Sequence, residues 1–229
     1  MHCERETLQN GTVVLISKAH RFGTDAMLLS GFCRPRRDEA AADLCSGCGI
    51  LALRWHDLGH RGRCEAVELC AEGSQLLADA CAQNGIAHIR PVTADLRGFA
   101  LDAPQTFDLV GCNPPYFCAG RPSPDPVRAA ARHEGSCTLR DAAECAARLL
   151  RYGGRFALCG RPQRLAETLC LLHELGLEPK RLALVKKEPR SLPALFLCEA
   201  KKGGRPGLKF EPDLLTGEGA GGYDDITGL

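Results

Sequence analysis

The chain has 229 residues, of which 45% are hydrophobic and 25% are charged, and its formal net charge is +1. These values are near the globular average and exclude a disordered or fibrous class, and the length suits one α/β domain with a modest extension. No apolar run approaches the roughly 18 residues that span a bilayer, and residues 1–6 lack the apolar core of a secretory signal. We therefore expect a cytoplasmic protein without membrane contact.

The first 38 residues predict a hairpin followed by a short helix. An Asn-Gly pair at residues 10–11 lies between two strand-like segments, and this dipeptide is the strongest short-range signal for a hairpin turn. Thr24 and Asp25 can cap the helix that follows. We expect residues 1–38 to form a small unit that covers a site in the domain behind it.

From residue 40 onwards, strand-like runs alternate with helical ones. Seven strands are predicted, at residues 40–45, 64–69, 89–93, 107–112, 155–159, 182–186 and 194–199. Four helices are predicted, at residues 51–58, 71–84, 139–150 and 162–175. Such alternation implies crossover connections, so we expect residues 39–210 to form an α/β domain with a seven-stranded, mostly parallel sheet and helices on both faces. Residues 211–229 are expected to be a loose tail.

A glycine-containing turn follows the first strand of this domain. The chain passes from Asp43 at the strand end through Ser46, Gly47 and Gly49 into a helix. The two glycines allow a sharp turn and the close approach of a ligand to the main chain. Glu68 follows Gly49 by 19 residues, at the end of the second strand, where a carboxylate can accept hydrogen bonds from both ribose hydroxyls of a nucleoside. Together these features predict a nucleoside-cofactor site.

The same glycine pattern also fits a dinucleotide-binding dehydrogenase. Asp43 and Asp95, each at a strand end, favour a methyltransferase instead, because such residues can hold the methionine part and the adenine amino group of a cofactor that has no pyrophosphate. Asp95 could alternatively cap a helix. The expected cofactor is S-adenosylmethionine.

Two cysteines of the turn, Cys45 and Cys48, form a C-x-x-C pair where a thioredoxin-like redox site would lie. Most of the 14 cysteines stand singly in apolar or Ala-rich runs, and we expect those to be reduced, small hydrophobic residues. Examples within or next to helical patterns are Cys70, Cys81, Cys145 and Cys170. No second Cys pair or His pair stands at ligand spacing, so no metal site is expected.

The candidate catalytic residues follow the fourth strand as Asn113-Pro114-Pro115-Tyr116. The Asn113 side chain and the Pro114 carbonyl, held by two consecutive prolines, can both accept hydrogen bonds from one amino group. This arrangement would orient the lone pair of an exocyclic amine, otherwise a poor nucleophile, for in-line attack on a sulfonium methyl group. Tyr116 offers a face on which an extruded base can stack. Asn-Pro-Pro is also an ordinary turn sequence, but its place after the fourth strand favours N-methyl transfer.

With these motifs, the sequence resembles the tRNA1(Val) (adenine-N6)-methyltransferase family over nearly its whole length. Further similarity lies in residues 22–29, 131–134, 161–165, 178–181 and 203–208. The resemblance implies a Rossmann-like class I methyltransferase fold and a head segment, containing Thr24 and Asp25, that folds over S-adenosylmethionine. It also implies the substrate, the adenine at position 37 of a tRNA, on the 3′ side of the anticodon. Two departures are Cys45, where the family usually has glycine, and a short acidic tail.

Charge is distributed unevenly along the chain. Residues 151–210 contain 13 Lys and Arg against 5 acidic residues. A polyanion gains affinity by releasing counterions from a basic face, so we expect tRNA to bind through this half, including Lys186 and Lys187. The loop after the catalytic tetrapeptide would extend the RNA contacts with Phe117, Arg121, Arg132 and His133.

Other methyl acceptors compete with RNA. A glutamine-directed protein N5-methyltransferase uses the same tetrapeptide, because a side-chain amide presents a similar nitrogen. Such enzymes usually carry a helical substrate domain ahead of the cofactor loop, whereas 42 residues precede Asp43 here. A DNA adenine methyltransferase would need a target-recognition region. A catalytically inactive RNA-binding module is disfavoured by Asn113 and Glu68, and no obligate protein partner is expected.

Overall fold

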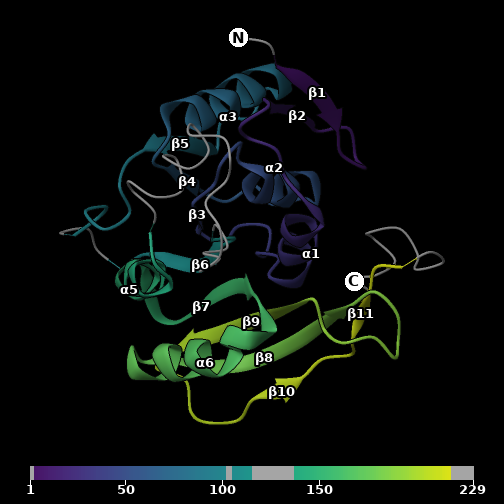
Figure 1. The fold of residues 1–229 in the computed structure, drawn as a ribbon. Coiled ribbons are helices and arrows are strands. Elements are labelled where there is room, and N and C mark those ends of the chain that lie inside the picture. Colours follow the sequence, from purple (N-terminus) through teal and green to yellow (C-terminus); the bar gives the residue numbers. More distant parts are fainter. Residues whose placement is uncertain (1–2, 102–104, 115–136, 218–229) are drawn as a thin grey trace.

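The computed structural model describes residues 3–101, 105–114 and 137–217, which contain one large sheet and a separate hairpin (Figure 1). The hairpin strands are β1 (Glu4–Thr7) and β2 (Val13–Ile16). The large sheet contains β3 (Ala41–Leu44), β4 (Cys64–Glu68), β5 (Ile89–Thr93), β6 (Phe107–Cys112), β7 (Leu150–Gly160), β8 (Leu177–Lys186), β9 (Leu195–Lys202), β10 (Lys209–Phe210) and β11 (Leu214–Leu215). The helices are α1 (Thr24–Phe32), α2 (Ile50–Asp57), α3 (Ala71–Asn84), α5 (Leu139–Leu149) and α6 (Leu165–Glu174), with a 3-10 turn, η1 (Pro162–Arg164), before α6.

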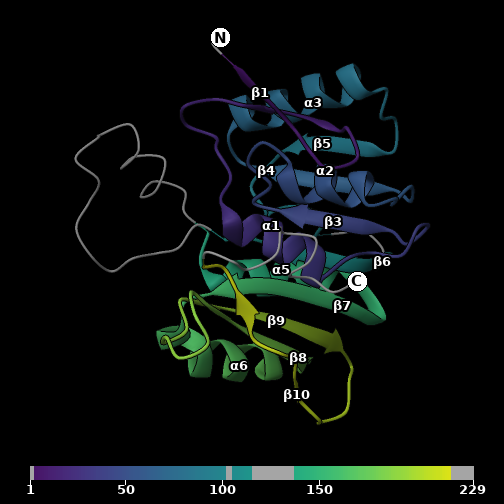
Figure 2. The ribbon, with the colours of Figure 1, turned by 90° about the vertical axis from the view of Figure 1, so that its right-hand side faces the viewer.

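The sheet has the strand order β10-β8-β9-β7-β6-β3-β4-β5 (Figure 2). Strand β11 also pairs with β8. Strands β7, β6, β3, β4 and β5 pair in parallel, whereas β9 is antiparallel to both β7 and β8. The predicted mostly parallel α/β sheet is confirmed, and all seven expected strands are in it. The count of seven was too low for the described residues, because the two-residue strands β10 and β11 raise it to nine. Through β11, the sheet continues past residue 210, where the loose tail was expected to begin.

Helices cover both faces of the sheet. One apolar core lies under α1, α2 and α3, and a second lies under α5 and α6 (Figure 1). Trp55 of α2 is completely buried in the first core, and its indole N–H donates to the Ser30 carbonyl of α1 at 3.2 Å. A Cβ at Gly111 of β6 would lie 2.9 Å from the Trp55 ring. Glycine in this central strand therefore allows the close approach of α2.

The N-terminal hairpin is confirmed, with Glu4 opposite Ile16 in an antiparallel pair. It docks on α2 through Asp57, whose carboxylate accepts from the backbone N–H groups of Asn10 and Thr12, both at 3.2 Å. Because Asp57 is buried, these hydrogen bonds fix the hairpin against the domain.

Two strands begin earlier than the sequence pattern predicts. β7 starts at Leu150 and contains Gly153 in a left-handed conformation, with φ of 79°. β8 starts at Leu177 and contains Pro179, beside which its register with β9 shifts. Glycine and proline usually interrupt strands, so the sequence pattern missed these first halves. Among the described helices, none combines the length and the apolar character needed to cross a membrane.

Candidate functional site

Several of the predicted site residues meet at one end of the sheet. Asp43 lies in β3, Glu68 ends β4, and Asn113 directly follows β6. These three strands are parallel, so their carboxyl ends lie at the same end of the sheet, which is where α/β proteins bind ligands. We refer to Asp43, Ser46, Gly47, Glu68 and Asn113 as the carboxyl-end site.

The glycine turn provides space at this site. Gly47 has φ of 56°, and a Cβ built there would meet no atom within 4 Å, so its outer side is open. Gly49 has φ of 79°, and a Cβ there would lie 2.4 Å from the Leu77 side chain. Gly49 therefore serves the packing of the turn against α3, whereas Gly47 leaves room for a ligand beside the backbone.

Cys45 also has a left-handed conformation, with φ of 56°. Glycine adopts this conformation without strain, whereas a side chain costs about 1–2 kcal/mol in it. The Cys45 thiol lies 3.4 Å from that of Cys137, just ahead of α5.

Glu68 holds the glycine turn and the start of α3. Its carboxylate accepts from the backbone N–H of Gly47 at 2.7 Å and from that of Cys70 at 2.8 Å. Each carboxylate oxygen keeps a further lone pair, so Glu68 can still accept hydrogen bonds from a ligand.

Asp43 is a buried acid whose carboxylate accepts few hydrogen bonds. Its side chain is 1% exposed, and its carboxylate accepts from the backbone N–H of Ala52 at 3.4 Å. Burial, and to a smaller extent the charge of Glu68, raise the pKa of Asp43 to about 8. The nearby Ser46 hydroxyl is buried and has no hydrogen-bond partner among the described residues. The site thus contains polar groups that a polar ligand could satisfy.

Asp95, expected near the cofactor, lies two residues after β5 and pairs with Arg97 at 2.5 Å. Hydrogen bonds from the Arg97 side chain and backbone lower the pKa of Asp95. The chain forms a turn here, so Asp95 caps no helix.

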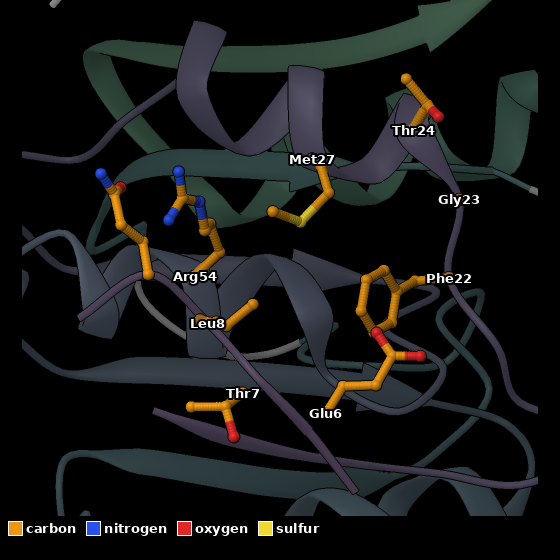
Figure 3. Close-up of a pocket in the computed structure, with 9 residues that line it drawn as sticks. Glu6, Thr7, Leu8, Phe22, Gly23, Thr24, Met27 and Arg54 are labelled. Carbon is orange, nitrogen blue, oxygen red and sulfur yellow. The ribbon is translucent and has the colours of Figure 1, made fainter. Parts of the chain in front are cut away.

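The head segment borders a cavity of about 450 Å³, and no residue of the carboxyl-end site is in its lining (Figure 3). Thr24 and Met27 line it from α1, Glu6 from β1 and Arg54 from α2. Asp25 is not part of this lining, and its carboxylate accepts from the adjacent Ala26 N–H at 2.9 Å. Of the two predicted head-segment residues, Thr24 alone therefore borders this cavity.

Asn113 and Pro114, the first half of the predicted catalytic tetrapeptide, are half-buried. The Cys159 thiol of β7 donates to Asn113 Oδ1 at 2.9 Å, a contact that the sequence did not suggest. The other predicted residues of this region fall outside the described residues; they are Pro115, Tyr116, Phe117, Arg121, Arg132 and His133.

The structure does not support a redox role for the C-x-x-C pair. Burial raises the pKa of Cys48 to about 12, and a hydrogen bond with Cys112 together with burial raises the pKa of Cys45 well above its usual value, so neither thiol is activated. Cys81 and Cys145 are buried as expected, but Cys70 and Cys170 are exposed. In the parts of the chain that the structure describes, no group of three His, Cys, Asp or Glu side chains could hold a metal ion.

Some of the basic side chains in residues 151–210 form ion pairs within the protein, which makes them less available for binding RNA than the sequence suggests. Lys186 pairs with Asp213 at 2.5 Å, and Arg181 pairs with both Glu199 and Glu211. Lys187, in contrast, is exposed. β8 is antiparallel to β9, which is antiparallel to β7, so β8 runs in the same direction as β7 and β6. Lys187, which follows β8, therefore lies at the same end of the sheet as Asn113.

No family model matches the chain, but curated relatives share its sequence. The tRNA1(Val) (adenine(37)-N6)-methyltransferase of Dickeya chrysanthemi is 35% identical over 142 residues, or 61% of this chain and 56% of that protein. The protein of the same name from Aeromonas hydrophila is 32% identical over 158 residues, or 67% of this chain and 64% of that protein. The resemblance to this methyltransferase family is confirmed. The chain spans less than two thirds of the length of either relative.

A comparison of structures agrees with the sequence relationship. The crystal structure of a predicted O-methyltransferase from Agrobacterium tumefaciens has a TM-score of 0.70 and 22% identity, and the match covers 90% of this chain and 96% of that one. The expected class I methyltransferase fold is confirmed.

Proposed function

We propose that this protein is an S-adenosylmethionine-dependent methyltransferase that methylates the exocyclic N6 of an adenine in tRNA. The observation that carries this proposal is the position of Asn113 and Pro114 at the same end of the sheet as the open Gly47 turn, Asp43 and Glu68. A nucleoside cofactor and an amino-group acceptor would thus be bound side by side. The names of the relatives from Dickeya and Aeromonas support the same reaction.

The residues present fit S-adenosylmethionine, which supplies an electrophilic methyl group on its sulfonium. Glu68 would accept from the ribose hydroxyls, and Asp43 would hold the ammonium of the methionine part. The open side of Gly47 would accept the ligand next to the backbone, and the buried Ser46 hydroxyl would gain a partner. The other residues proposed to line the cofactor site are Thr24, Asp25, Gly49 and Asp95.

Asn113 and Pro114 would act on the adenine amino group. Their two oxygens would accept hydrogen bonds from its two N–H groups, which turns the nitrogen lone pair out of conjugation with the ring and towards the methyl group. Positive charge develops on this nitrogen during transfer, and the two oxygens stabilise it. The same residues pre-position the amine, so no strong base is required before the attack. After transfer, the adenine nitrogen is an acidic ammonium centre that loses one proton to solvent, and S-adenosylhomocysteine is the other product. Tyr116 remains the proposed stacking residue for the base.

The specific target proposed is adenine 37 of tRNA1(Val), as in the names of the relatives, with the reaction in the cytoplasm. Residues 39–210 would form the methyltransferase domain, and residues 1–38 would cover the cofactor. RNA would approach from the side of Lys187, which is exposed at the carboxyl ends of the strands.

Mass spectrometry of nucleosides from total tRNA tests this proposal, using cells with the gene, without it, and with the gene coding for Asn113→Ala. We expect N6-methyladenosine to fall on deletion and to return with the wild-type gene but not with the variant. Unchanged tRNA nucleosides, together with loss of methylglutamine from a cellular protein, would refute the proposal in favour of the protein N5-methyltransferase alternative.

A further inference from the structure

The hydrogen bond between Cys159 and Asn113 is the contact that the proposed reaction leaves unexplained. The thiol donates to Asn113 Oδ1, with 2.9 Å between sulfur and oxygen. Cys159 is 1% exposed, so water does not compete for this contact. A thiol is a weak donor, but in a buried place its hydrogen bond gives the amide a defined direction.

The sheet determines that these two residues meet. Cys112, the last residue of β6, is opposite Leu158 of β7, so the next residues along, Asn113 and Cys159, are also neighbours. Asn113 has already left its strand, whereas Cys159 remains within β7 and opposite Leu197 of β9. A residue held in the sheet by its pairing with β9 therefore contacts the first residue of a loop.

We propose that Cys159 is a positioning residue that fixes the orientation of the Asn113 side-chain amide. This inference rests on the proposed function. An asparagine amide can flip by 180° about its terminal bond, which exchanges an acceptor oxygen for a donor NH2 group. In the flipped state, Asn113 would present N–H groups to an adenine amine that needs acceptors. The Cys159 S–H donates to Oδ1 in the productive state, whereas the flipped state would offer the sulfur only an N–H group, for which it is a poor acceptor; Oδ1 keeps its second lone pair for the substrate.

Cys159 also belongs to the apolar core beside α1 and α2, so a purely structural role must be separated from positioning. Cys198 of β9 is a suitable control, since it is equally buried in a neighbouring strand but belongs to the core on the opposite face. Replacing either cysteine by alanine removes one sulfur atom from a core. Only Cys159→Ala also removes a donor to Asn113, and Cys159→Ser restores a donor of similar size.

The first measurement is steady-state methylation of an unmodified tRNA transcript with S-adenosylmethionine. We expect Cys159→Ala to lower kcat about three- to tenfold, as for the loss of one neutral hydrogen bond, with an unchanged Kd for S-adenosylhomocysteine. Cys159→Ser should recover kcat to within about twofold of wild type. Cys198→Ala should leave kcat unchanged, although it should lower the thermal stability about as much as Cys159→Ala does. Equal kcat in Cys159→Ala and wild type, or equal loss in the Ser and Ala variants, would overturn the proposal.

A second measurement does not depend on the identity of the substrate. The side-chain NH2 signals of Asn113 can be assigned in 1H–15N NMR spectra by their loss in Asn113→Ala. We expect these signals to shift or broaden in Cys159→Ala and to stay in place in Cys198→Ala. If they are unchanged in Cys159→Ala, the positioning role is wrong even where methylation is observed. If they respond while tRNA is not methylated, the proposed substrate is wrong and the positioning role stands.

Discussion

The Glu68 carboxylate accepts a hydrogen bond from the Gly47 backbone N–H at 2.7 Å, which joins the end of β4 to the turn after β3. Glu68→Ala would remove this link together with a charged acceptor for the ribose. We expect its affinity for S-adenosylhomocysteine to fall by about 1.5 to 3 kcal/mol in titration calorimetry, and Glu68→Gln, which keeps one acceptor, to lose less. Saturable binding of NAD without any response to S-adenosylhomocysteine would instead favour the dehydrogenase alternative.

Asp43 predicts that cofactor binding depends on pH. Because its pKa is raised to about 8, this acid is mostly protonated at pH 7 in the free protein. An ammonium group placed beside it favours the carboxylate, so binding at pH 7 should release a proton, and affinity should rise between pH 6 and 8. Calorimetry at pH 7 in two buffers of different ionisation enthalpy measures this release. We expect Asp43→Asn to abolish it, and Asp79→Asn, on the exposed side of α3, to keep it. Equal binding enthalpies in both buffers for wild type would contradict this role of Asp43.

The same pKa shift makes the stability of the free protein fall as the pH rises, whereas the affinity for the cofactor rises. Asp43 binds its proton more tightly in the folded protein than at its ordinary pKa of 3.8. Its contribution to the free energy of unfolding is therefore fully present below about pH 4 and is lost as the pH rises towards 8. In urea denaturation without cofactor, we expect Asp43→Asn to gain stability relative to wild type as the pH rises through this range.

The left-handed backbone at Cys45 limits which residues can replace it. A β-branched residue is strongly disfavoured at a φ of 56°, so Cys45→Val should lower the free energy of unfolding by about 1–3 kcal/mol. Cys45→Gly relieves the backbone but loses the contact with Cys137, and we expect it to stay within about 1 kcal/mol of wild type. Urea denaturation of the three proteins tests this order, and equal stability of the Val and Gly variants would contradict the left-handed turn.

The RNA face predicts a charge effect confined to one end of the sheet. Lys187 and Arg190 are exposed after β8. Lys201 is also exposed, but it pairs with Arg155 of β7 and lies near the other end of the sheet. Reversal of Lys187 and Arg190 to Glu should weaken tRNA binding about tenfold and reduce its salt dependence, without changing S-adenosylhomocysteine binding. Lys201→Glu should have little effect. If it weakens tRNA binding equally, or if binding is insensitive to salt, tRNA does not use the proposed face.

Much of the fold was predictable because its central strands are short apolar runs between clear turns. The first halves of β7 and β8 were not, since Gly153 and Pro179 imitate strand ends. The start of β7 pairs with β6 through Leu150, and the start of β8 pairs with β9 in spite of Pro179. β10 and β11 contain two residues each and carry no periodic signal.

The positions of Asp43, Gly47 and Glu68 were predictable from strand ends and glycine spacing. Contacts between distant segments were not. The ion pair of Lys186 with Asp213 and the hydrogen bond of Cys159 with Asn113 depend on which strands become neighbours. A cysteine in an apolar run looks like a small hydrophobic residue, so its donor function appears only when an acceptor lies beside it.

The most direct test of the proposed reaction uses S-adenosylmethionine with a deuterated methyl group, purified protein and an unmodified tRNA1(Val) transcript. After digestion, mass spectrometry should find the label on N6 of adenosine, and it should be absent when adenine 37 is replaced by guanine. Asn113→Ala should fold, keep its affinity for S-adenosylhomocysteine and lose turnover by about two to three powers of ten. Label on another base, on the protein alone, or at an undiminished rate in Asn113→Ala would contradict the proposed transfer to adenine N6.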